Sequence, residues 1–339
     1  MSRFKYILFA LLLTIGLGSG CEQLILDTDT VDSPRENFEY LWQECLEKYS
    51  FFEYKDIDWQ EVYNRYSPQI NENMSQIELF DVLAAMLNEL RDGHVNLISP
   101  LNVSRFDIDL LGQDNFEFRL IRENYLGDDY YRTGAFTHDF IADDRVAYVR
   151  YSSFNNFPSN LDLDFLFLRY ENTVGMIIDL RENGGGSLSN ALRILNRFAP
   201  EKQLIYNSFI KNGPGPDDFA AAQAAYVEPL EDRLTYDKPV IVLVDRGTYS
   251  AASFFSLGAL ALPNMSLMGD VTGGGLGIPN GGQLPNGWTY RFSISQTLTP
   301  DGQNYEDGIP PDERINLSLG DRNLGKDSII ERAILRLTR

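Results

Sequence analysis

One serine in this chain stands where a serine could act as a nucleophile. Ser250 follows an apolar, β-branched run at 240–244 and a turn, and a helical pattern over 251–262 begins directly after it. The free N–H groups and the dipole of a helix N-terminus favour the alkoxide and the oxyanion that acyl transfer creates. A serine that only caps the helix fits the same pattern. Ser253, one turn later, is the second candidate.

A serine nucleophile needs a base to take its proton, and the chain has only two histidines, His94 and His138. His94 follows Arg91-Asp92-Gly93, where a glycine can end a helix and present the next side chain. His138 lies in the polar run 137–139, which predicts a surface loop. We therefore favour His94 as the base.

Three consecutive glycines at 184–186 form the third feature. They follow an apolar strand pattern at 176–180 and precede a helical pattern that starts near Ser187. Glycine lets backbone N–H groups approach a bound atom closely, so this turn could hold an oxyanion. A nucleotide-phosphate site is the competing interpretation, but no Lys-Ser/Thr pair follows and the G-x-G-x-x-G spacing is missing.

An α/β fold has to position these features. Apolar strand patterns, among them 146–151, alternate with helical patterns such as 189–198, which is typical of a layered domain with a buried sheet. Shorter alternating stretches such as 116–120 predict additional strands upstream. The expected organisation is a signal peptide (1–20), a tether (21–33), a helical N-terminal domain (34–94), a small β-rich segment (95–143) and an α/β catalytic domain (144–339).

The N-terminal residues are typical of an export signal, because Arg3 and Lys5 lead into an apolar run from Tyr6 to Leu17. The small residues directly before Cys21 resemble a bacterial lipobox, which implies lipidation of Cys21; plain secretion is the alternative. We therefore expect an exported protein, anchored by lipid in the cell envelope on the periplasmic or surface face, or at the outer membrane.

The bulk composition excludes several classes of function. A formal net charge of −20 disfavours binding to phosphate backbones, so nucleic acid is not an expected partner. Beyond Cys21 the only cysteine is Cys45, which leaves no internal disulfide in an exported chain. So few histidines and cysteines also argue against a zinc site. We expect no cofactor.

Five motifs, taken in order, resemble the tail-specific or C-terminal processing peptidases, and within them the branch similar to the tricorn core protease. They are Leu-Arg-Asp-Gly-His at 90–94, Asp-Leu-Arg-x-Asn at 179–183, Thr-Tyr-Ser-Ala-Ala at 248–252, Gly-Asp-Val-Thr-Gly-Gly at 269–274, and Glu-Asp-Gly-Ile-Pro-Pro-Asp at 306–312. Each motif alone is modest, but five in family order are specific.

The resemblance implies a crotonase/ClpP-like layered α/β core and a serine peptidase that acts on a peptide or protein. Ser250 would attack the carbonyl, His94 would be the general base, and Glu306 would orient His94. The oxyanion hole would consist of the N–H groups of Ala251 and of Gly185 or Gly186. A solvated loop acid is the plain alternative for Glu306, and Glu182 is a weaker candidate for the orienting acid.

Three departures from the family pattern are visible. Where many members carry the lysine of a serine-lysine dyad, this chain has Gly275, which makes such a dyad improbable. Gly93 replaces the serine that the tricorn-like branch places before its histidine. About fifty residues separate His94 from the strand at Val146, fewer than the ~100 of a typical peptide-binding PDZ domain.

A protein that keeps this fold and only binds a ligand or peptide is the alternative from another class, because fold does not fix function. The joint presence of Ser250, His94 and Glu306 favours the peptidase, since a pure binder has no chemical reason to keep all three.

Overall fold

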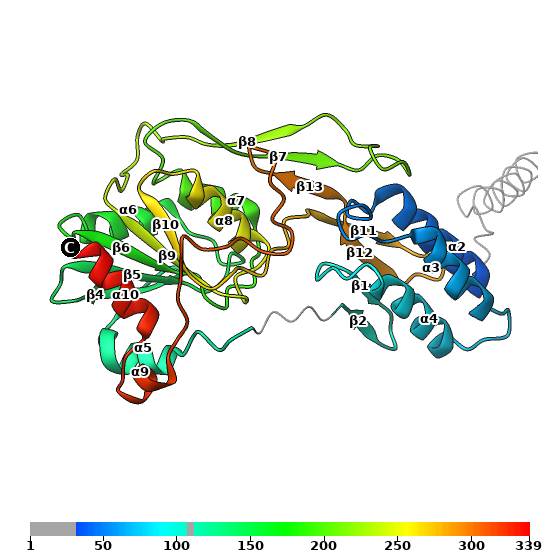
Figure 1. The fold of residues 1–339 in the computed structure, drawn as a ribbon, viewed down its shortest axis with the longest axis horizontal. Coiled ribbons are helices and arrows are strands. Elements are labelled where there is room, and N and C mark those ends of the chain that lie inside the picture. The colour runs from blue at the N-terminus through cyan, green and yellow to red at the C-terminus, as the bar shows by residue number, and fades with distance from the viewer. Residues whose placement is uncertain (1–31, 107–111) are drawn as a thin grey trace, which may run out of the picture.

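The computed structural model describes residues 32–106 and 112–339. The expected signal peptide, Cys21 and nearly all of the expected tether lie outside this part of the chain. Two bodies stand side by side in Figure 1, a larger α/β body and a smaller unit that contains the N-terminal helices. We call the smaller one the helical unit.

A seven-stranded sheet forms the centre of the α/β body. In spatial order its strands are β14 (Glu313–Arg314), β10 (Met265–Gly269), β9 (Val240–Val244), β6 (Gly175–Asp179), β5 (Val146–Tyr151), β4 (Phe136–Ile141) and β3 (Tyr131–Thr133). Neighbours from β14 to β5 are parallel, and β4 and β3 add an antiparallel edge. The carboxyl ends of β6 and β9 meet at one edge, so the turns that follow them are adjacent.

Helices cover both faces of this sheet and bury its apolar side chains. One face carries α6 (Asn160–Arg169), α7 (Leu188–Leu195) and α8 (Ala251–Leu260). The other carries α5 (Phe118–Ile121), the π-helical turn η2 (Arg122–Leu126) and α10 (Ser328–Leu337), with α9 (Leu319–Asn323) preceding α10. Every residue of β5, β6 and β9 is buried, as expected of parallel strands between two helical layers.

The helical unit has a core of its own. Its helices are α2 (Pro34–Lys48), α3 (Trp59–Tyr66), the 3-10 turn η1 (Ser67–Gln69) and α4 (Gln76–Asn88). They pack on a four-stranded sheet with the spatial order β11 (Pro279–Gln283), β12 (Thr289–Ser293), β1 (Asn96–Ile98) and β2 (Val103–Arg105). Two strands of this sheet therefore come from late in the chain.

A third sheet joins the two bodies. It consists of β13 (Ser295–Leu298), β7 (Gln203–Ile210) and β8 (Gln223–Val227), and β13 follows β12 after a single residue. In Figure 1 this sheet extends from the α/β body toward the helical unit.

The expected layered α/β core and the helical N-terminal region are confirmed. The strands expected at 146–151 and 240–244 coincide with β5 and β9, and the helices expected after 187 and 250 are α7 and α8. The strand expected at 116–120 is wrong, because these residues lead into α5. Phe116, Leu120 and Ile121 are the buried positions there, and that spacing is helical although the letters alternate.

The β-rich segment expected at 95–143 is not a separate insertion. Its strands β1 and β2 complete the sheet of the helical unit, while β3 and β4 extend the sheet of the α/β body. Strand pairing over long sequence distances explains the difference, because such pairing leaves no local signal.

Candidate active site

Ser250 lies at the N-terminus of α8, directly beyond the turn that follows β9. Its backbone has φ +55° and ψ −122°, a strained conformation for a residue with a side chain. Its N–H donates to the Gly274 carbonyl at 2.9 Å, which holds the turn. The side chain makes no capping hydrogen bond. The helix-capping interpretation is therefore not what the structure shows.

His94 reaches this serine from the helical unit. Its Nε2 lies 3.1 Å from Ser250 Oγ, and its ring is 5 % exposed. Beyond the end of α4, Arg91 takes a left-handed φ of +48°, and the backbone N–H of His94 donates to Asp92 Oδ1 at 2.8 Å. Arg91, rather than the expected Gly93, thus makes the turn that presents the ring.

The His94 imidazole is held in its neutral form. Burial lowers its pKa to about 4, the positive charges of Arg291 and Lys55 act in the same direction, and the carboxylate of Asp92 opposes them. A neutral imidazole whose Nε2 faces a hydroxyl can accept that proton. The geometry and the protonation state therefore both fit a general base.

Two groups face the other ring nitrogen of His94. Ser293 Oγ, at the end of β12, lies 3.4 Å from Nδ1, and Asp92 Oδ1 lies 4.0 Å from it. Asp92 is buried, and its Oδ2 has no hydrogen-bond partner among the described residues. Sequence reasoning did not select either residue; for Ser293 no local signal exists, because it lies on a distant strand.

Glu306 is buried behind this pair without touching the imidazole. Its Oε2 accepts the N–H of Gly277 at 2.8 Å, and its carbonyl accepts the N–H of Gly275 at 2.9 Å. Among residues 32–106 and 112–339, neither carboxylate oxygen lies within 4.0 Å of a His94 ring nitrogen. Burial, followed by the nearby charge of Asp92, raises the pKa of Glu306 well above its ordinary value.

The glycine turn packs directly against the serine. A Cβ on Gly185 would lie 2.9 Å from both Ala251 N and Ser250 Cβ, so no side chain fits there. The N–H of Gly185 donates to Asn183 Oδ1 at 3.0 Å. Within the described chain, the N–H groups of Gly186 and Ala251 have no hydrogen-bond acceptor. Of the two candidate glycines, Gly186 is thus the one with a donor left for an oxyanion.

A buried ion network fixes the strand end from which this turn begins. Arg181, fully buried, contacts Asp179 Oδ2 at 2.6 Å and Asp327 Oδ2 at 2.9 Å. Asp179 also accepts the phenol proton of Tyr148 at 2.7 Å. Paired buried charges of this kind are stabilising only as a complete set, so the motif at 179–183 has a structural role beneath the site.

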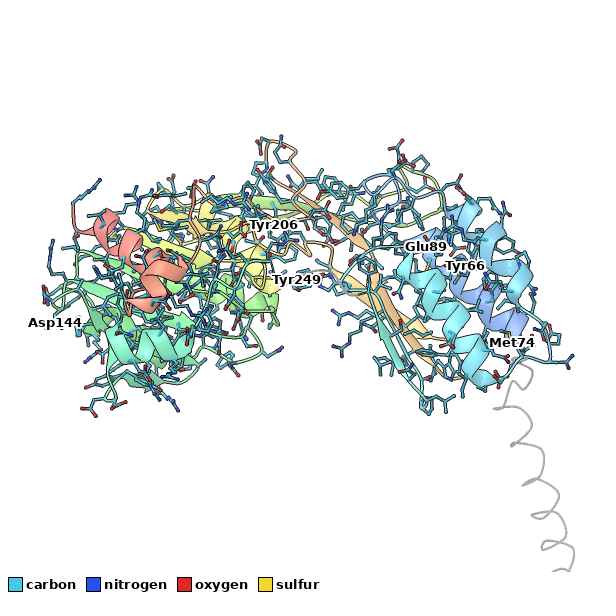
Figure 2. All side chains as sticks on the ribbon, turned by 60° about the horizontal axis from the view of Figure 1, so that its bottom comes forward. Tyr66, Met74, Glu89, Asp144, Tyr206 and Tyr249 are labelled. Carbon is cyan, nitrogen blue, oxygen red and sulfur yellow. The ribbon has the colours of Figure 1, made fainter. Side chains whose placement is uncertain are left out.

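Gly275, where the resemblance would place the lysine of a serine-lysine dyad, has no room for a side chain. Gly275 has φ +71°, and a Cβ on it would lie 2.3 Å from Cζ of Tyr249. The Tyr249 ring also lies against His94, with 5.0 Å between ring centroids. Figure 2 shows Tyr249 on the side of the α/β body that faces the helical unit.

The second candidate nucleophile, Ser253, and the weaker candidate acid, Glu182, both lie outside the serine-histidine pair. Ser253 is fully buried and donates its hydroxyl proton to the Thr248 carbonyl at 3.0 Å, so it holds the turn. Glu182 makes no contact with His94 or Ser250 in the described chain; its backbone N–H donates to Asp245 Oδ1. Neither residue is brought into the serine-histidine pair.

His138 is not in a surface loop, so that expectation is wrong. It lies in β4, fully buried, with Nδ1 2.7 Å from Tyr170 OH and Nε2 2.9 Å from Thr133 Oγ1. Both ring nitrogens therefore have partners. The polar residues on either side of His138 fit this strand because they occupy its half-buried positions. Burial lowers the pKa of His138 to about 4.

Cys45 is a buried free thiol. No helix within residues 32–106 and 112–339 has the length and apolar character needed to cross a membrane. No cluster of three potential metal ligands occurs in the same ranges.

Comparisons with known proteins identify relatives of this chain. The sequence profile of peptidase family S41 matches residues 145–315, and that of the tricorn protease C1 domain matches residues 31–88. The carboxy-terminal processing protease CtpA of Bacillus subtilis (strain 168) is 27% identical over 177 residues, which cover 52% of this chain and 36% of CtpA. The chain thus aligns with little more than a third of that relative.

Solved structures match over more of the chain. A Parabacteroides merdae ATCC 43184 protein assigned as a peptidase is 41% identical, with a TM-score of 0.84 over 91% of this chain and 98% of that one. Mature CPAF has the same fold with a TM-score of 0.67 at 12% identity, over 90% of this chain and 97% of CPAF.

Proposed function

The chain belongs to peptidase family S41, and from this premise we propose that it hydrolyses peptide bonds through a covalent acyl-enzyme on Ser250. The observation that carries the proposal is the 3.1 Å contact between Ser250 Oγ and His94 Nε2. It joins a strained serine at a helix N-terminus to a histidine kept neutral by burial. A neutral base within hydrogen-bond reach is what activates a serine hydroxyl.

In the acylation step, His94 Nε2 takes the proton from Ser250 Oγ as the oxygen bonds to the carbonyl carbon of the substrate. The N–H groups of Ala251 and Gly186 donate to the oxyanion of the tetrahedral intermediate. The C–N bond then breaks, and the protonated His94 gives its proton to the leaving amine. Water, deprotonated by the same nitrogen, attacks the acyl-enzyme and releases the second product.

Glu306 is the acid of the proposed Ser-His-Glu arrangement, although it makes no hydrogen bond to His94. Because it does not touch His94, its effect on the imidazole is indirect, and the nearby charge that acts most strongly on Glu306 itself is that of Asp92. The raised pKa of Glu306 favours one proton on this buried acid, which limits the negative charge that Asp92 and Glu306 place in the core together.

Reaction with a fluorophosphonate, followed by mass spectrometry of the folded protein, tests the proposal. We expect an adduct on Ser250 in the parent and none in Ser250→Ala, while His94→Ala should slow labelling by about 10⁴-fold or more. His138→Gln is the matched histidine control and should label at the parent rate. A folded parent that forms no adduct would instead support the silent binding protein.

We propose in addition that the chain is exported and held at the cell envelope by a lipid on Cys21. The support is the apolar run after Lys5 and the small residues before Cys21. Metabolic labelling with a palmitate analogue should mark the parent and leave Cys21→Ser unlabelled. Equal labelling of both, or of neither, would contradict lipidation at this cysteine.

A further inference from the structure

A cavity opens beside the serine-histidine pair. Its volume is ≈ 220 Å³, and it is lined by Gly93 and Tyr249, which directly precede His94 and Ser250 in the chain. A group bound in this cavity therefore lies close to any peptide held at Ser250. The catalytic steps derived above make no use of it.

Three cationic side chains line this cavity, and they come from three different parts of the chain. Lys55 follows α2, Arg91 follows α4, and Arg246 follows β9. Lys55 Nζ donates to the Arg91 carbonyl at 2.6 Å, and the Arg91 guanidinium donates back to the Lys55 carbonyl. Arg246 Nη1 donates to the carbonyls of Thr272 and Asp307 at 2.7 and 3.0 Å.

These contacts fix the positions of the cations without neutralising their charges. All of the acceptors are backbone carbonyls. Within residues 32–106 and 112–339, no carboxylate lies within 4.0 Å of Lys55, Arg91 or Arg246, whereas 15 of the other 24 lysines and arginines there have such a partner. In a chain of net charge −20, three such cations around one cavity call for an anion.

The acidic residues that line the same cavity do not cancel this charge. Glu306 is buried, is tied to Gly277 N–H, and has a raised pKa that favours its neutral form. Asp307 is exposed and lies next to the Tyr54 phenol. The positive charge of Lys55 is also felt at His94, whose pKa it lowers, so the cavity and the base are electrostatically connected.

We propose that this cavity is a substrate subsite that binds a carboxylate, with Lys55, Arg91 and Arg246 as its ligands. The inference rests on the peptidase activity proposed above and names its substrate class: peptides that carry an acidic group near the bond to be cut. Two arginines and a lysine supply forked and point-charge donors to one carboxylate. We assign this carboxylate to an Asp or Glu side chain of the substrate.

Competition for Ser250 tests the subsite. Ser250 is labelled with a small neutral fluorophosphonate while hexapeptide mixtures are added in matched sets, with Glu or Gln at each position and with a free or amidated C-terminus. We expect the carboxylate-bearing member to protect Ser250 at least tenfold better than its neutral twin. A preference tied to Glu supports the subsite, whereas a preference tied only to the free C-terminus overturns the assignment to an acidic side chain.

Variants of the cavity's cationic residues test whether the preference for acidic peptides comes from this cavity. Lys55→Met and Arg91→Met keep side-chain bulk and remove charge. Measured against each variant's own labelling rate without peptide, protection by the acidic peptides should fall about tenfold, and protection by the neutral peptides should stay the same. Lys55→Arg should restore the preference, and Lys326→Met, at an exposed lysine without a carboxylate partner in the described chain, should keep it.

The outcomes separate the two proposals. The labelling rate without peptide reports the serine-histidine machinery alone, so a parent that does not label contradicts the peptidase itself. A parent that labels normally but shows equal protection by acidic and neutral peptides, or no protection by either, overturns the carboxylate subsite. A preference that survives in Lys55→Met and Arg91→Met overturns it as well.

Discussion

The α/β body and the helical unit contribute to the site in different ways. The α/β body supplies Ser250 and the N–H groups of Ala251 and Gly186 from the turns that follow two adjacent parallel strands, β9 and β6. The helical unit supplies His94 and the Ser293 hydroxyl from a helix end and a strand end. The nucleophile thus belongs to the α/β body, while its base belongs to the helical unit.

The two buried acids near His94, Asp92 and Glu306, are where substitution should have the largest effect. They test which body holds the base in place. Asp92 belongs to the helical unit, whereas Glu306 is bound to the 275–277 segment. We expect Asp92→Asn to slow Ser250 labelling about a hundredfold. That is less than the 10⁴-fold seen when a directly hydrogen-bonded triad aspartate is amidated, because 4.0 Å exceeds hydrogen-bond length.

The same labelling assay on Glu306→Gln, with thermal unfolding as a check on folding, completes this comparison. A larger loss for Glu306→Gln than for Asp92→Asn would move control of the base to the α/β body and contradict the assignment to the helical unit.

A smaller effect is expected at the serine that faces Nδ1. Ser293→Ala removes one hydrogen bond to the imidazole and should slow labelling about tenfold, the equivalent of roughly 1.4 kcal/mol. Ser295→Ala is the matched control, because this buried serine accepts from Ile278 N–H and makes no contact with His94. Equal losses in both variants would indicate a general packing effect.

The pH dependence sharpens the contrast between the two buried histidines. Because the pKa of His94 is lowered to about 4, by burial first and then by Arg291 and Lys55 against the opposing Asp92, labelling should fall by half near pH 4. An ordinary histidine would give that midpoint near 6.5. A parent midpoint near 6.5 would show that the imidazole is solvated.

Both histidines should also affect stability, with the same sign. Their folded pKa values lie below the unfolded value, so the unfolded chain binds more protons between about pH 6.5 and 4, and stability falls as the pH drops through that window. Urea unfolding at several pH values measures this. His138→Gln should weaken the dependence without changing the pH profile of labelling.

The smallest expected effect concerns strain in the α/β body. Ser250→Gly removes the side chain at φ +55° and should stabilise the fold by about 1 kcal/mol while abolishing labelling. Ser250→Ala keeps the strain and should show no such gain in urea unfolding. Equal stability of the two variants would mean that the turn holds no strain at this residue.

The residues that the α/β body contributes to the site could be predicted from the sequence better than the groups around His94 in the helical unit. Ser250 and the glycine turn lie at boundaries between apolar strand patterns and helical patterns, so local rules locate them. Asp92 and Ser293 could not be selected in this way, because their proximity to His94 depends on a loop conformation and on a strand nearly two hundred residues later. His138 was misplaced since polar neighbours conceal a buried strand position.

The pairing of β1 with β12, Asn96 opposite Arg291, has a consequence for the order of folding. A chain emerges from its N-terminus, and contacts distant in sequence form late. The sheet beneath α2, α3 and α4 therefore stays incomplete until residues 279–293 are available. We expect His94 to meet Ser250 only when most of the polypeptide has been synthesised, so a nascent chain has no working active site with which to cut itself or its neighbours.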